Sequence, residues 1–155
     1  MGLKDLFEDI VGISNRPEIK GERFERFVSE NIFIDLLFDL VETTNSFESN
    51  SVRFEERSMN PDFLFRDKRT KEEFWIEVKF RAHTFRNNKG QEVCEICTEK
   101  QLYRYIDIQK KTGKQVYICL GLGGTALDPE TIHLIPVNEA YPQIFRSVLS
   151  KTRIG

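Results

Sequence analysis

The sequence has no apolar stretch long enough to cross a lipid bilayer. A spanning helix needs about 20 consecutive apolar residues, whereas long apolar stretches here, such as Ile32 to Val41, are interrupted by acids, in this case Asp35 and Asp39. The segment that opens the sequence is amphipathic and acidic, unlike the basic and then apolar layout of a signal peptide. We therefore expect no membrane segment and a cytoplasmic protein.

Cysteine, glycine and proline are also scarce. Three Cys are an odd number, which does not build a disulfide framework and fits a reducing compartment. Nine Gly and five Pro, with 39% hydrophobic residues and 13 Phe, exclude a collagen-like or disordered chain. A chain of 155 residues has the size of one ordinary domain, so we expect a single domain over residues 1–155.

Bulk positive charge is missing as well, because the net charge is −2 and the pI about 5.8. This excludes a histone-like protein that binds nucleic acid through overall charge. The charge is unevenly spread: residues 1–60 carry 13 acidic and 7 basic side chains, and residues 61–155 carry 12 acidic and 16 basic ones. A polyanion is therefore expected to meet the second part of the chain.

Hydrophobic periodicity predicts helices in the first part of the chain. Apolar residues at helical spacing favour a short helix over residues 3–11 and a longer one over residues 17–37. Residues 38–44 fit either a continuation of this helix or a strand, and their β-branched residues favour the strand. Residues 45–60 are polar and without clear period, with a possible strand over residues 51–55.

Alternation and turn residues predict the remaining elements. Thr98 and Gln101 form the pattern of a capping box that starts a helix ending at Thr112, before Gly113. We expect an α/β fold with a mixed central sheet flanked by helices, in the order α-α-β-β-β-α-β-β-α. Besides that helix, the predicted elements are strands at 62–66, 74–81, 91–97, 115–121 and 131–137, a hairpin loop at 67–73, a turn at 87–90 and a helix at 141–151.

The two strands at 62–66 and 74–81 carry the candidate catalytic residues. Alternation along the second strand places Glu77 and Lys79 on one face, and an antiparallel pairing of the two strands places Asp62 roughly opposite Glu77. Two carboxylates opposite each other on a sheet are destabilising unless something positive lies between them. Lys79 is one candidate for this positive group, and a divalent cation held by oxygen ligands is the other.

With Pro61 before Asp62 and the Glu-x-Lys triplet at Glu77, the sequence resembles the PD-(D/E)xK nuclease superfamily. Glu25, in the segment Gly-Glu-Arg-Phe-Glu, matches the helix that precedes the catalytic strands of that superfamily. The segment from Gln101 to Tyr105 is similar to the QxxxY signature of RecB-type nuclease domains. The pair Lys100-Gln101 also resembles a feature of archaeal Holliday junction resolvases. The resemblance covers residues 17–121.

This resemblance implies a restriction-endonuclease-like core and a Mg²⁺- or Mn²⁺-dependent nuclease that hydrolyses DNA phosphodiester bonds. A carboxylate-held divalent cation neutralises the phosphate, activates water and stabilises the leaving oxygen. The expected metal ligands are Asp62, Glu77, the Val78 carbonyl and Glu25. Lys79 would act on the attacking water, with Gln101 holding that water or a phosphate oxygen. The expected DNA contacts are Arg81, Lys100, Arg104 and Tyr105.

Other interpretations stay open at this stage. Asp62, Glu77 and Lys79 also fit a solvated sheet face with a weak ion pair, and Gln101 also fits a purely capping role. Cys94 and Cys97 alone lack the four ligands of a structural zinc site. The main alternative function is a catalytically inactive nuclease-fold module that binds DNA or protein. Since cutting both strands at one place requires two active sites, a homodimer is a candidate assembly.

Overall fold

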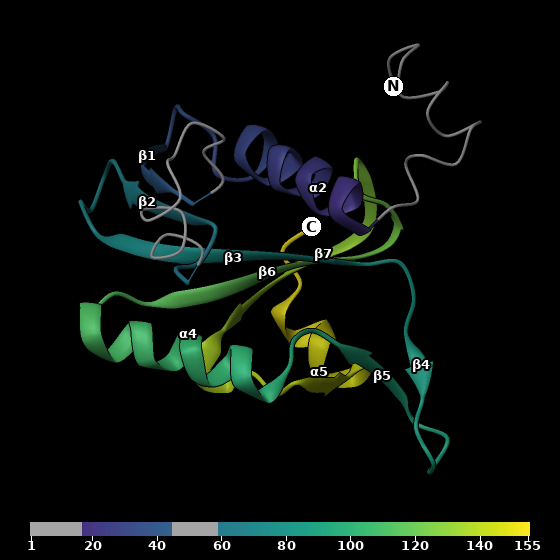
Figure 1. Ribbon diagram of the computed structural model, residues 1–155. Helices are drawn as coiled ribbons and strands as arrows, with labels where there is room; N and C mark the ends of the chain where they lie inside the picture. Colours follow the sequence, from purple (N-terminus) through teal and green to yellow (C-terminus); the bar gives the residue numbers. More distant parts are fainter. Residues whose placement is uncertain (1–16, 45–58) are drawn as a thin grey trace.

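The computed structural model describes residues 17–44 and 59–155. Its centre is a five-stranded sheet of order β1-β2-β3-β6-β7, in which β3 and β6 are parallel and the other neighbours antiparallel. Helix α2 (Pro17–Asn31) covers one face and α4 (Glu99–Thr112) the other (Figure 1). The strands are β1 (Phe38–Thr43), β2 (Phe63–Asp67), β3 (Glu73–Arg81), β6 (Val116–Thr125) and β7 (Asp128–Pro136).

The face under α2 is an apolar core rich in phenylalanine. Phe24 and Val28 of α2 are fully buried against side chains of β2, β3 and β6. At Gly121 the helix approaches the sheet so closely that an added Cβ would lie 2.6 Å from the ring of Phe24. The buried sheet residues of this core are Phe63, Phe65, Ile76, Val78 and Cys119.

Helix α4 crosses from β3 to β6 on the opposite face, as parallel neighbours require. Its first turn has the capping box that the sequence predicts: the Thr98 hydroxyl accepts from Gln101 N, and the Gln101 side chain accepts from Thr98 N. It ends at Gly113, whose φ of 68° belongs to the left-handed region that favours glycine. Tyr105 is the buried residue of this helix.

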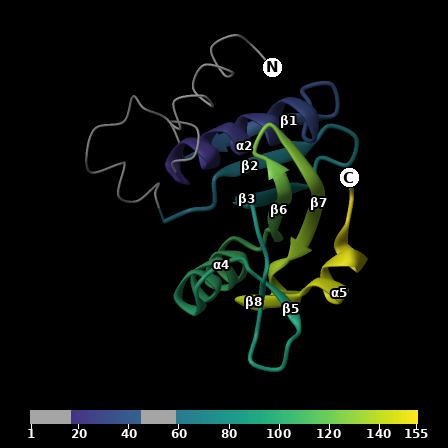
Figure 2. The same cartoon turned by 90° about the vertical axis from the view of Figure 1, so that its right-hand side faces the viewer.

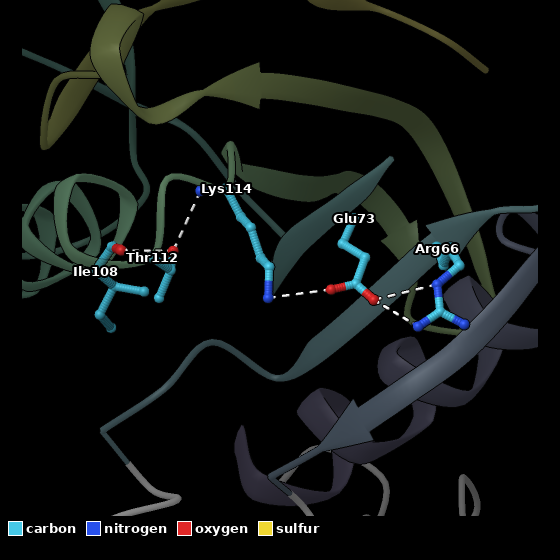
Figure 3. A network of polar contacts seen from close by, with 5 residues as sticks. All are labelled: Arg66, Glu73, Ile108, Thr112 and Lys114. Carbon is cyan, nitrogen blue, oxygen red and sulfur yellow. Dashed lines mark hydrogen bonds and ion pairs between the residues drawn. The ribbon is translucent and has the colours of Figure 1, made fainter. Parts of the chain in front are cut away.

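The far end of α4 is joined to the β2–β3 hairpin by charged side chains. Glu73 forms ion pairs with Arg66 at 2.7 Å and with Lys114 at 3.0 Å (Figure 3). Both cations hold the pKa of Glu73 below its ordinary value. The loop between β2 and β3 is closed by Asp67, whose carboxylate accepts from the backbone N–H groups of Arg69 and Thr70. The predicted hairpin loop is thereby confirmed.

A second, smaller sheet lies beside the start of α4, as Figures 1 and 2 show. It has the order β4-β5-β8. Its strands are β4 (Phe85–Arg86), β5 (Glu92–Glu95) and β8 (Gln143–Phe145). The short helices of the last third are η2 (Val137–Glu139), α5 (Arg146–Leu149) and η3 (Ser150–Thr152). His133 of β7 holds this end of the chain, because its Nδ1 lies 2.7 Å from the carbonyl of Leu149.

Two sequence predictions are wrong in part. The helix predicted over 17–37 ends at Asn31, and Phe33 beyond it turns inward to pack on Phe65 and Phe38. The helix predicted over 141–151 is replaced by β8 and two short helices, because residues 143–145 pair with β5. The mixed sheet between helices and the strand at 38–44 are confirmed, apart from Thr44, which lies just past β1. Within the described ranges, no helix is long and apolar enough to span a membrane.

The predicted helix at 3–11 and the possible strand at 51–55 lie outside the described residues. The short edge strand predicted at 91–97 is present only as β5 (Glu92–Glu95), and it is central instead of at the edge, because β4 and β8 pair on its two sides. The strands predicted at 115–121 and 131–137 are confirmed as the cores of β6 and β7.

Candidate active site

Asp62 lies at the point where β2 separates from β3. The last β2–β3 pair is Phe63 opposite Ile76, and one further step in the same register places Asp62 opposite Glu77. The Asp62 carboxylate takes the place of the missing backbone partner, because its Oδ2 accepts from Val78 N at 2.8 Å. The Asp62 carbonyl accepts from Thr44 N at 3.0 Å. These bonds fix a carboxylate beside the middle of β3.

Glu77 is the buried acid of this site, with only 8% of its surface exposed. Burial raises the pKa of Glu77 well above its ordinary value, and the negative charge of Asp62 raises it further. Lys79 and Tyr105 act in the opposite direction without cancelling the rise. Two carboxylates therefore share a confined space in which both are costly to ionise together.

Tyr105 of α4 faces the same carboxylates. Its hydroxyl is close enough to affect the pKa of Glu77, yet within the described part of the chain it has no hydrogen-bond partner of ordinary geometry. Burial, and then the charge of Glu77, raise the pKa of Tyr105 above its ordinary value. This buried hydroxyl without a hydrogen-bond partner lies beside two carboxylates and adds a further oxygen atom to a site that favours positive charge.

Lys79 follows Glu77 on the same face of β3, as the alternation predicts. The opposite face of this strand, with Ile76 and Val78, belongs to the core under α2. The charge of Lys79 favours the ionised form of both Glu77 and the Cys97 thiol, although burial still raises the pKa of Cys97 overall. The positive charge of Lys79 therefore stabilises the ionised form of Glu77, at the position where the sequence predicts a positive group.

The donor set suits a hard divalent cation. Asp62, Glu77 and Tyr105 offer oxygen atoms, and Mg²⁺ is commonly held by one or two carboxylates with water in the remaining positions. Among residues 17–44 and 59–155, no three His, Cys, Asp or Glu side chains gather closely enough to hold a metal by themselves. The carboxylate pair thus fits Mg²⁺ or Mn²⁺, but not a cage built from acidic side chains alone.

Glu25 is not part of such a three-carboxylate group with Asp62 and Glu77. It lies half-buried on α2, next to Phe24, which packs on the opposite face of the sheet from Glu77. A metal-ligand role for Glu25, and for the Val78 carbonyl, stays a prediction.

Gln101 and Arg81 are both held by backbone contacts. The Gln101 side-chain oxygen accepts from Thr98 N, which confirms the capping role and leaves the amide nitrogen to act on another group. The Arg81 guanidinium donates to the carbonyls of Glu95 at 2.7 Å and Ile96 at 3.1 Å. Arg81 therefore fastens the small sheet to the end of β3, and its expected phosphate contact stays a prediction.

Arg104 is half-buried on α4, and Lys100 is exposed on it. The Arg104 guanidinium lies 5.4 Å from the centre of the Tyr105 ring. Arg104 Nε is buried and, in the described portion of the chain, has no hydrogen-bond partner. Lys100 is exposed in the first turn. Their phosphate contacts stay predictions.

The zinc interpretation finds no support in the described residues. Cys94, in β5, and Cys97, two residues past its end, are both buried in the core under α4. Burial raises the pKa of both thiols, Cys94 to about 11. Such thiols stay protonated and pack as small apolar groups.

One site residue escaped the sequence analysis. Thr44 holds the Asp62 carbonyl through its backbone N–H, and its hydroxyl lies 3.4 Å from the same atom. It is 18 positions from Asp62 along the chain. Nothing in the sequence marks this contact, because it depends on how β1 pairs with β2.

Comparisons with known proteins address the fold. No family model matches the sequence, and no curated protein sequence matches it. Among solved structures, the chain is similar to Hjc of Archaeoglobus fulgidus, described as a Holliday junction resolvase from an archaeal hyperthermophile. The TM-score is 0.55 with 18% sequence identity, over 87% of this chain and 90% of that one.

The chain has the restriction-endonuclease-like fold. The sequence motifs resemble archaeal Holliday junction resolvases as well, so the similarity of fold agrees with that resemblance. In this fold the carboxylates of Asp62 and Glu77 lie where β2 and β3 separate. At 18% identity the comparison supports the fold alone, and the function follows from the residues of the site.

Proposed function

We propose that this chain is a metal-dependent nuclease that hydrolyses phosphodiester bonds of DNA. The observation that carries this proposal is the pair of half-buried Asp62, held by Val78 N, and buried Glu77, next to Lys79 on one face of the sheet. A protein rarely keeps two acids in such a confined position without a use, because the arrangement opposes folding. Similarity of fold to a Holliday junction resolvase supports the same direction.

Asp62 and Glu77 would hold Mg²⁺ or Mn²⁺ in this account, with Val78 and Glu25 as further candidates. When bound, such an ion neutralises phosphate charge and lowers the pKa of water. The chain supplies the positioning, because the Val78 N–H group holds one oxygen of the Asp62 carboxylate and so fixes the orientation of that group. A rigid ligand pair keeps the reacting groups in line.

Lys79 would orient the attacking water and contact the phosphate. Its ammonium lies on the same face as Glu77, within range to change the pKa of that acid. Tyr105 would donate its unsatisfied hydroxyl to a carboxylate or to a ligand oxygen. The amide nitrogen of Gln101, held at the helix start by Thr98, would bind the water or a phosphate oxygen. Arg81, Lys100 and Arg104 would position the DNA backbone.

Cleavage of a DNA panel tests the proposal. Purified protein with Mg²⁺ or Mn²⁺ is incubated with linear, nicked, single-stranded and four-way-junction DNA, next to Asp62→Asn and an exposed matched control, Asp107→Asn. We expect metal-dependent cutting by wild type and the control, and loss of cutting in Asp62→Asn. Cleavage by Asp62→Asn equal to wild type would contradict the active site.

A second outcome identifies the alternative function. If wild type binds DNA but cuts none of these substrates with either metal, the chain is a binding module with the nuclease fold. Sedimentation of the protein with and without DNA then determines whether it works as a homodimer, which paired cuts in both strands would require.

A further inference from the structure

The β4–β5 hairpin extends beyond the small sheet to which it belongs. Strand β8 pairs with β5 only at Val93, Cys94 and Glu95, whereas β4 pairs at Phe85 and Arg86 with Val93 and Glu92. Residues 86–92 therefore continue as a two-stranded ribbon that projects from the body (Figures 1 and 2).

The tip of this ribbon has a fixed conformation. The Asn87 side-chain oxygen accepts from the backbone N–H groups of Lys89 and Gln91, and its amide nitrogen donates to the Gln91 side chain. Arg86 donates to the carbonyl of Gly90 at 2.8 Å, and Gly90 has a φ of 75°. A tip held this way needs little ordering when it binds a partner.

The turn that joins the two strands of the ribbon carries positive charge and no acid. From residue 82 to residue 91 the chain contains Arg86 and Lys89 and no Asp or Glu. The one acid of the ribbon, Glu92, lies opposite Arg86 in the second strand, is paired with Arg146 at 2.8 Å and accepts from Thr84. Asn88 and Lys89 are exposed at the end of the turn. The charge of the tip is therefore complementary to a polyanion.

The ribbon is also tied to the candidate active site. Its first strand follows β3, the strand of Glu77 and Lys79, and its second leads to the start of α4 (Figure 1). Arg81 links the two ends by donating from β3 to the carbonyls of Glu95 and Ile96. A DNA segment with its scissile phosphate at Glu77 would thus have the ribbon beside it.

We propose that the β4–β5 hairpin is a DNA-binding arm that contacts duplex DNA next to the cleavage site. The inference rests on the proposed function, because it takes DNA as the ligand of the site. A two-stranded ribbon fits the major groove of B-DNA. Arg86 and Lys89 bind phosphates on either side of the groove, and Asn88 lies between them at the tip.

Binding of a labelled DNA duplex, measured by fluorescence anisotropy in EDTA at several salt concentrations, tests the arm. The double variant Arg86→Gln/Lys89→Gln removes two charges and keeps a polar side chain at both positions. The matched control Lys110→Gln/Lys111→Gln removes two charges from the last turn of α4, at the opposite end of that helix from the hairpin. Circular dichroism confirms that both variants fold.

We expect the hairpin variant to bind about tenfold more weakly at low salt and to lose roughly 1–2 units of the slope of log K against log salt, since each phosphate contact on B-DNA contributes about 0.9. The control should stay close to wild type. Equal affinity and slope in the two variants would overturn the arm, as would a wild type that binds no duplex DNA.

The two proposals can fail separately. If wild type cleaves DNA and the hairpin variant binds as tightly as wild type, the nuclease proposal holds and the arm proposal is contradicted. If binding depends on the hairpin but no DNA of the panel is cleaved, the arm proposal holds and the nuclease proposal is contradicted.

Discussion

The two faces of β3 have different compositions and different consequences. Under α2, Ile76 and Val78 lie in a core made of apolar side chains. Under α4, Trp75 joins an apolar core as well, but the same face carries Glu77 and Lys79, with Asp62 alongside. Successive residues of one strand thus serve stability on one side and place charged groups on the other.

The difference teaches where this fold accepts a loss of stability. Apolar burial stabilises by about 25 cal/mol per Å², whereas a buried carboxylate next to another opposes folding. The α2 face gains from every buried residue, and the α4 face gives up part of that gain at Glu77. Substitutions on the two faces should therefore separate stability from activity.

The largest expected effect is on activity at the polar face. Lys79→Met should lower kcat about 10²–10⁴-fold, the usual contribution of a positioned proton-transfer group. The variant should still fold, because Met keeps the apolar stem of lysine, but it should melt somewhat lower in EDTA because the carboxylate pair loses its positive neighbour. Single-turnover cleavage with saturating metal measures the loss. Lys110→Met, at an exposed position of α4, serves as the control. An unchanged kcat in Lys79→Met would show that Lys79 has no role in the reaction.

The apolar face should respond in the opposite way. Ile76→Ala removes a fully buried side chain and should lower the free energy of unfolding by about 2–5 kcal/mol. Urea denaturation measures this loss. At low temperature, where the variant is still folded, its activity per folded molecule should equal that of wild type. A selective loss of activity with unchanged stability would contradict the separation of the two faces.

Glu77→Gln should raise stability while it removes activity. The folded-state pKa of Glu77 lies above its ordinary value, so this group destabilises the fold as the pH rises from about 4.5 through the raised value. Gln does not titrate and escapes that loss. In EDTA at neutral pH the variant should melt higher than wild type, and the difference should shrink towards acidic pH. A variant that melts lower at neutral pH would contradict the buried-charge account.

The smallest expected effect concerns the capping box at the start of α4. Thr98→Ala removes the acceptor for Gln101 N and should lower the free energy of unfolding by about 1 kcal/mol. Gln101→Glu keeps the capping pattern and should preserve stability. Urea denaturation of both variants, with cleavage rates at low temperature, separates capping from a role in the reaction. Equal stability in Thr98→Ala and wild type would remove the cap from this account.

The sequence predicts the polar face well because its signals are local. Alternation along β3 assigns Glu77 and Lys79 to one side, and the charged loop before it aligns Asp62 opposite Glu77. The capping box depends on residues three apart. Each of these features needs only neighbouring residues or one hairpin, and hairpin register follows from strand pattern and loop length.

The failures have a different origin, because they depend on partners far along the chain. Ile144 fits a helical pattern, yet it pairs with Cys94 of β5. Phe33 continues the hydrophobic period of α2, but its ring stacks on Phe65 of β2. The unsatisfied hydroxyl of Tyr105 becomes visible only when α4 is placed against β3. Tertiary contacts decide these positions, and local propensity does not.

Thermal melting with and without Mn²⁺ tests most directly whether the polar face is a metal site. A ligand that binds only the folded state raises the melting temperature. Wild type and Ile76→Val, which alters the apolar face alone, should both melt higher in Mn²⁺ than in EDTA, and Glu77→Gln should not respond. An equal response of all three proteins would contradict the assignment of Asp62 and Glu77 as the metal-binding pair.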